Sequence, residues 1–161
     1  MKPVLVYLTL IFMLFACKRK NKKITYIRKK TNPIIQIQFE RTACYGKCPV
    51  FKLTLNPNGT ADFEGIKYVK FIGKGSAIIP VNVFQNLKQK LDSMDVRNLK
   101  SEYSVNVTDN PTGYLSILFE DFSVKNIKDY GLRGTPELKQ VYKQLTDLAK
   151  QTQWKSIENE K

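Results

Sequence analysis

The chain has 161 residues, 42% hydrophobic and 25% charged, so its length and composition suit one folded domain of ordinary globular type. It contains no histidine, which excludes catalytic triads and metal sites that need an imidazole. The formal net charge is +13, which by its sign alone favours a polyanionic partner.

The positive charge is concentrated near the N-terminus. Nine of the 27 basic side chains lie in residues 1–30, which hold no acid, so the rest of the chain has 18 basic and 14 acidic side chains. A nucleic-acid module carries its basic stripe on the fold itself, often with aromatic side chains for stacking. We therefore expect no nucleic-acid partner.

The first segment has the pattern of a signal peptide. After Met1-Lys2, an apolar run of 12 residues extends from Val4 to Phe15. A helix of that length is too short to cross a hydrocarbon core of about 30 Å, but it fits the apolar region of a signal peptide. We predict that residues 1–16 are removed on export; a plain secretory signal or an uncleaved core helix is the alternative.

Leu14-Phe15-Ala16-Cys17 resembles the lipobox of bacterial lipoproteins. The resemblance implies that Cys17 is acylated and becomes the mature N-terminus. Residues 17–33 are then a basic linker, which either contacts the anionic bilayer surface or is simply solvated. We expect the protein in the bacterial cell envelope, anchored by lipid to the outer membrane and facing the periplasm.

Alternating polarity predicts strands in the first half of the remaining chain. The expected strands are Ile34–Glu40, Val50–Asn56, Thr60–Gly65, Lys67–Ile72 and Ala77–Ile79. Asn58-Gly59 predicts a hairpin turn, and Gly73-Lys74-Gly75 a second turn between the last two strands.

The second half contains two amphipathic helices and a further pair of strands. Asn82 is the expected cap of a helix whose apolar stripe comprises Phe84, Leu87, Leu91 and Met94. A polar loop is predicted over 101–113. Strands Tyr114–Phe119 and Phe122–Ile127 follow, with a bulge expected at Asn126. Thr135-Pro136-Glu137 predicts the start of a second helix, with an apolar stripe of Leu138, Val141, Tyr142, Leu145, Leu148 and Ala149.

These elements predict an α+β fold: an antiparallel sheet of about six to seven short strands, covered on one face by both helices. We expect a single domain over 34–154 and a polar tail over 155–161. The acidic residues are scattered, and no pair of them suggests an acid–base couple. No cofactor is indicated.

Cys44-Tyr45-Gly46-Lys47-Cys48-Pro49 is the most unusual local motif. In an exported chain whose Cys17 is acylated, the two remaining cysteines are expected to form a disulfide. That bond requires the chain to double back, which Gly46 permits, while Pro49 favours an extended Cys48. Tyr45, Gly46 and Pro49 are therefore the turn residues that we expect to support the disulfide.

Two other interpretations of the motif stay open. Lys47 and Arg41 can lower a thiol pKa, which would suit a redox-active pair, although the spacing is not the C-x-x-C of thioredoxin-like proteins. A metal site would need more ligands than two thiolates, and we expect none.

A weaker candidate lies before the second helix. Arg133, Gly134 and Thr135 precede its N-terminus, where backbone N–H groups can hold an anion. The alternative is an ordinary entry loop with a solvated arginine.

Cys44-Tyr45-Gly46-Lys47-Cys48-Pro49-Val50-Phe51, followed by Asn58-Gly59 and Gly65, resembles an uncharacterised bacterial domain of unknown function that is common in lipoproteins. The resemblance runs from about Ile34 to Trp154. It implies a location and a fold class but no activity and no catalytic residues.

We therefore expect a non-catalytic module, held at the bilayer by acylated Cys17 and the basic linker, which binds an envelope protein or glycan or has a structural role. The alternative is an envelope thiol–disulfide redox protein that uses Cys44 and Cys48.

Overall fold

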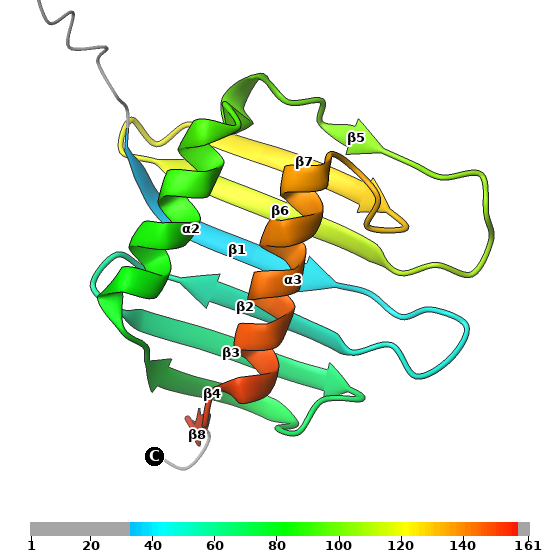
Figure 1. Ribbon diagram of the computed structural model, residues 1–161. Helices are drawn as coiled ribbons and strands as arrows, with labels where there is room; N and C mark the ends of the chain where they lie inside the picture. The colour runs from blue at the N-terminus through cyan, green and yellow to red at the C-terminus, as the bar shows by residue number, and fades with distance from the viewer. Residues whose placement is uncertain (1–32, 158–161) are drawn as a thin grey trace, which may run out of the picture. The chain divides into compact units, whose positions relative to one another are not determined.

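The computed structural model describes residues 33–157, which form an α+β domain with two helices on one face of an eight-stranded sheet (Figure 1). The fold class is as predicted, with slightly more strands. In chain order the elements are β1 (Ile34–Arg41), β2 (Val50–Leu55), β3 (Thr60–Lys67), β4 (Gly73–Ile78), α2 (Val81–Ser93), the short 3-10 helix η1 (Val96–Asn98), β5 (Glu102–Tyr103), β6 (Thr112–Phe119), β7 (Val124–Tyr130), α3 (Pro136–Gln151) and β8 (Lys155–Ser156).

The strand order in the sheet is β5-β7-β6-β1-β2-β3-β4-β8. Strands β1 to β4 form an antiparallel meander, and the β6–β7 hairpin pairs with the other side of β1. Only the short β5 runs parallel to its neighbour among the described strands. The first strand of the domain therefore lies in the middle of the sheet.

The core lies between the sheet and the two helices. Alternate residues of each long strand are buried on this face, as Ile37 and Phe39 are in β1. In α2 the buried residues are Phe84, Leu87 and Leu91. In α3 they are Leu138, Val141, Tyr142, Leu145, Thr146 and Ala149. The helical stripes predicted from the apolar spacing are the ones that cover the sheet.

The opposite face of the sheet is polar, as is common for antiparallel sheets with one solvated face. Neighbouring residues in register form a row across six strands, namely Lys128, Tyr114, Glu40, Lys52, Glu64 and Lys74. Charges of opposite sign alternate from Glu40 to Lys74. At the other end of the row, the Lys128 ammonium lies 2.9 Å from the Glu102 carboxylate.

The predicted turn at Gly73-Lys74-Gly75 is wrong. β3 continues to Lys67, the chain turns through residues 68–72, and β4 begins at Gly73. Gly65 and Gly75 are needed for close packing: a Cβ at Gly65 would lie 1.9 Å from the Phe71 carbonyl oxygen, and one at Gly75 would lie 2.9 Å from the Phe71 ring. Phe71 thus packs against the hairpin because two glycines leave it room.

Three smaller expectations were also wrong. Helix α2 is capped at Pro80, immediately before Val81, without a side-chain hydrogen bond, so Asn82 lies inside the helix. The register of β7 is regular at Asn126, and the extra residues fall at Ile35 of β1 and at Ile66 of β3. The polar segments expected to be loop and tail contribute the two-residue strands β5 and β8.

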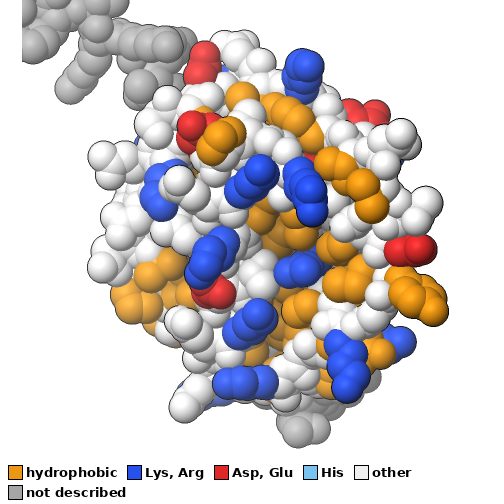
Figure 2. All heavy atoms as spheres, turned by 45° about the vertical axis from the view of Figure 1, so that its right-hand side comes forward, with side chains coloured by type: hydrophobic (Ala, Val, Ile, Leu, Met, Phe, Trp, Pro, Cys, Tyr) orange, Lys and Arg blue, Asp and Glu red, His pale blue; other side chains and the backbone are white. Residues whose placement is uncertain are grey.

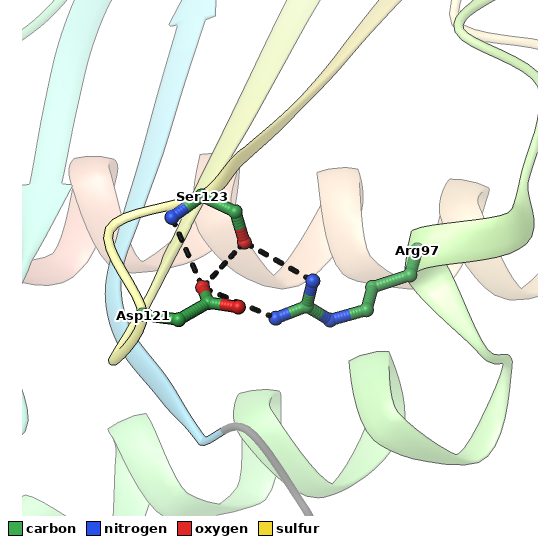
Figure 3. A network of polar contacts seen from close by, with 3 residues as sticks. All are labelled: Arg97, Asp121 and Ser123. Carbon is green, nitrogen blue, oxygen red and sulfur yellow. Dashed lines mark hydrogen bonds and ion pairs between the residues drawn. The ribbon is translucent and has the colours of Figure 1, made fainter.

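A polar network attaches the segment after α2 to the β6–β7 hairpin (Figure 3). The Arg97 guanidinium donates to the Ser123 hydroxyl at 3.1 Å and lies 3.7 Å from the Asp121 carboxylate. It also stacks 3.5 Å from the centre of the Phe119 ring. This contact joins segments that are far apart in sequence at one end of the sheet.

Candidate functional site

Cys44 and Cys48 form a disulfide in the loop between β1 and β2, as the sequence predicted. Their Cα atoms are 5.7 Å apart, well within the reach of a disulfide. Gly46 has a φ of 147°, in the region that favours glycine, and its N–H donates to the Cys44 carbonyl. Pro49 is half-buried immediately before β2, and Tyr45 is 89% exposed at the loop surface.

Hydrogen bonds join this disulfide loop to the segment before β6 and to the first residue of β6. The Tyr45 N–H donates to the Asp109 carbonyl at 3.1 Å. Thr42 and Thr112 bond reciprocally: the Thr42 N–H donates to the Thr112 carbonyl, and the Thr112 N–H donates to the Thr42 hydroxyl at 2.8 Å. The exposed Tyr45 ring therefore lies on a loop that the disulfide and these hydrogen bonds hold in place.

The predicted anion contact at Arg133, Gly134 and Thr135 lies at the start of α3. The backbone N–H groups of Arg133 and Gly134 donate to the carboxylate of Asp129, at 3.0 and 2.8 Å. The Thr135 hydroxyl accepts from the Leu138 N–H and caps the helix. The Arg133 and Gly134 N–H groups are thus already bonded to Asp129. An external anion would have to contact the Arg133 side chain or displace Asp129.

Asp129 and Tyr142 form a buried polar pair that the sequence analysis missed. Asp129 is fully buried on the inner side of β7, and Tyr142 of α3 is 3% exposed and stacked on Phe39 with ring centres 5.3 Å apart. Burial first, and then the Asp129 carboxylate, raise the pKa of Tyr142 well above its usual value. The Asp129 charge acts on the hydroxyl, but the hydroxyl makes no hydrogen bond of good geometry within residues 33–157.

A basic hollow lies beside Tyr142, where β1 ends against α3. We call it the Arg41 hollow; its volume is about 360 Å³, and it is lined by Arg41, Leu132, Lys139, Tyr142, Lys143, Thr146, Asp147 and Lys150. On the face shown in Figure 2, Lys and Arg side chains gather around a hollowed strip of hydrophobic side chains, with few acids among them. In the sequence, only Arg41 could have indicated this site, because it lies two residues after the buried Phe39 and so on the same side of the strand.

The expectations of export and lipid anchoring concern residues that the structure does not describe. Cys17, the signal peptide and most of the basic linker lie outside the described part of the chain. Within residues 33–157, no group of three or more acidic or cysteine side chains is arranged to hold a metal ion, and no helix has both the length and the apolar character that a bilayer span requires.

The model of one protein family, described as "Domain of unknown function (DUF6438)", matches residues 35–149, more than half of the chain. The matched range begins in β1 and ends within α3, so it includes the disulfide loop and the Arg41 hollow. A search of curated proteins gave no match.

Proposed function

Because the chain belongs to the family of the domain of unknown function DUF6438, whose description names no activity, we propose a function from the chain's own residues. The protein is a bacterial lipoprotein whose acylated Cys17 and basic linker hold the domain at the periplasmic side of the outer membrane. There the domain serves as a non-catalytic module that binds an envelope protein or glycan, or that has a structural role.

The observation that carries this proposal is the Cys44–Cys48 disulfide. Disulfides form and persist in exported proteins and are rare in the reducing cytosol. The bond therefore supports export, the step that the apolar run ending at Leu14-Phe15-Ala16-Cys17 would direct.

The basic linker supports the anchoring part of the proposal. A single acyl chain binds a bilayer only marginally, whereas several chains, or one chain with basic residues, anchor a protein stably. Eight cations follow Cys17 within residues 18–30, and each contributes about 1 kcal/mol near an anionic surface. Lipid and charge together would keep the domain on the membrane.

The disulfide loop around Tyr45 supports the binding part of the proposal. Tyrosine is among the residues that contribute most to protein interfaces. A loop closed by a disulfide and bonded to Asp109 and Thr112 loses little conformational freedom on binding. The ring is thus an ordered, exposed contact for a partner.

Metabolic labelling with radioactive palmitate tests the anchor. In a bacterium that produces the full chain, we expect the wild type to take up label, to sediment with membranes and to have an intact mass that lacks residues 1–16. The Cys17→Ser variant loses the label and the membrane association, while the matched Cys44→Ser variant keeps both. A full-length, unlabelled chain that begins with Met1 would contradict the proposal.

One observation favours the redox alternative: both cysteines are only half-buried in a surface loop, next to Lys47. Thiols in such a place are accessible to a dithiol substrate. Catalysed thiol–disulfide exchange by the purified protein would replace the binding role with an enzymatic one.

A further inference from the structure

The lining of the Arg41 hollow carries a marked excess of positive charge. It contains four cations, Arg41, Lys139, Lys143 and Lys150, and a single acid, Asp147, for a formal charge of +3. The Asp147 carboxylate is already engaged by Lys143 at 2.5 Å. An anionic ligand would find at least three cations that are not neutralised inside the hollow.

Arg41 is the unusual member of this set. It follows Ile37 and Phe39 on the helix-covered side of β1, and desolvation there lowers the pKa of its guanidinium. Its Nε is buried without a hydrogen-bond partner among residues 33–157. A half-buried guanidinium whose buried nitrogen lacks a partner, with three lysines around the same hollow, favours an external anion as its counter-charge.

Tyr142 supplies a second unpartnered group at the same place. It lines the hollow and is 3% exposed, and its hydroxyl, although near the Asp129 carboxylate, has no hydrogen-bond partner of good geometry among residues 33–157. Asp129, whose charge would repel an anion, is not part of the lining, and its oxygens accept from the Arg133 and Gly134 amides. The hollow thus offers donors and positive charge together.

We propose that the Arg41 hollow binds the phosphate group of a phosphomonoester. A phosphomonoester is close to a dianion at neutral pH and suits a lining of charge +3 better than a single carboxylate does. The guanidinium fork of Arg41 matches phosphate geometry, and the lysines serve as point charges around it. The hollow, at about 360 Å³, is larger than a phosphate, so it also accommodates part of the molecule that carries the group.

The phosphomonoester can belong to a soluble metabolite or to a membrane lipid, since the headgroup chemistry is shared. The site consists of residues of the folded domain and does not depend on acylation of Cys17. Two probes separate the sources: glycerol 3-phosphate, which is soluble, and dihexanoyl phosphatidic acid, a short-chain lipid with the same phosphomonoester.

The experiment measures binding of each probe to the full chain, kept in neutral detergent, by calorimetry and by broadening of the probe's ³¹P resonance. We expect Arg41→Gln to abolish binding and the double variant Lys139→Gln/Lys150→Gln to weaken it about tenfold, since two nearby charges are lost. The double variant changes exposed side chains of α3 and leaves the core intact. Its matched control is Lys70→Gln/Lys100→Gln, which removes two exposed lysines outside the hollow and should bind as wild type does.

Tight binding of glycerol 3-phosphate would assign the site to soluble ligands, and preference for the short-chain lipid would assign it to a lipid headgroup; either supports the proposal. Three results would overturn it. These are no binding of either probe below about 10 mM, binding that survives Arg41→Gln and the double variant, or equal weakening in the control.

Discussion

Tyr142 combines deep burial with a hydroxyl that lies near the Asp129 carboxylate but has no hydrogen-bond partner of good geometry within residues 33–157. Its ring packs on Phe39, so its contribution to the core comes from the aromatic surface. Burial and the Asp129 charge raise the pKa of Tyr142 and keep the phenol protonated in the folded chain. The same residue therefore links core packing to the stability of the protein at high pH.

The variant Tyr142→Phe tests this link. At pH 7 we expect the free energy of unfolding to change by less than about 0.5 kcal/mol, since no hydrogen bond of good geometry is lost. A pKa raised by folding means that the unfolded chain releases its proton first, near pH 10. The wild type therefore loses stability as the pH rises above about 10, and Tyr142→Phe loses less.

Urea unfolding at pH 7 and at pH 10.5 measures the difference between the two proteins. Tyr45→Phe is the matched control, because that ring is 89% exposed in the folded chain. If wild type and Tyr142→Phe lose the same stability between the two pH values, the assignment of Tyr142 is wrong.

At the scale of elements, the disulfide loop joins β1 to β2 by a covalent bond across five residues. The double variant Cys44→Ser/Cys48→Ser should lower the free energy of unfolding by about 2 kcal/mol, because the unfolded chain regains the entropy of the open loop. The far-ultraviolet circular dichroism should not change, since both strands are paired with other neighbours. Urea unfolding gives the magnitude.

Reduction of the wild type with dithiothreitol should reproduce the loss seen in the double variant, which controls for the serine hydroxyls. The same proteins separate the two proposed functions. A structural disulfide predicts that wild type and double variant are equally inactive toward a disulfide-bonded test substrate. Exchange catalysed by the wild type alone would favour the redox alternative.

The elements that could be predicted from sequence are those with a local cause. The alternation from Gln36 to Glu40 in β1 and the apolar stripe of α3 each reflect the period of one element. The hairpin at Gly73 was misplaced because glycine serves turns and close packing alike, and only the folded structure shows Phe71 against Gly65 and Gly75. Strands β5 and β8, of two residues each, depend on neighbours distant in sequence.

The same distinction applies to the candidate sites. Cys44 and Cys48 are the two cysteines that remain once Cys17 is acylated, so their pairing in an exported chain could be predicted, on the condition that the chain doubles back between them. Arg41, Asp129 and Tyr142 come from β1, β7 and α3, and no local pattern relates them. Tyr142 was predicted to face the core as part of the apolar stripe of α3. Arg41 and Asp129 lie just beyond the predicted strands Ile34–Glu40 and Phe122–Ile127, which the structure extends to Arg41 and Tyr130.

At the scale of the whole domain, the two faces of the sheet are stabilised by different forces. The inner face gains from apolar burial beneath α2 and α3, which does not depend on the order of charges. The outer face carries the row of alternating charges that includes Glu40, Lys52 and Glu64, neighbours in register on β1, β2 and β3. Cross-strand pairs of opposite charge contribute roughly 0.2–1 kcal/mol each, and like charges oppose pairing.

Lys52→Glu tests whether the row contributes to stability. The substitution places three carboxylates side by side across the centre of the sheet, so we expect a loss of about 1–2 kcal/mol in the free energy of unfolding at low salt. High salt should recover much of the loss, because exposed charges are screened. The control Lys70→Glu makes the same charge change in the turn between β3 and β4, outside the row, and should change stability little. Urea unfolding at low and high salt measures both, and a loss that is equal in the two variants or unchanged by salt would show that the order of charges in the row does not matter.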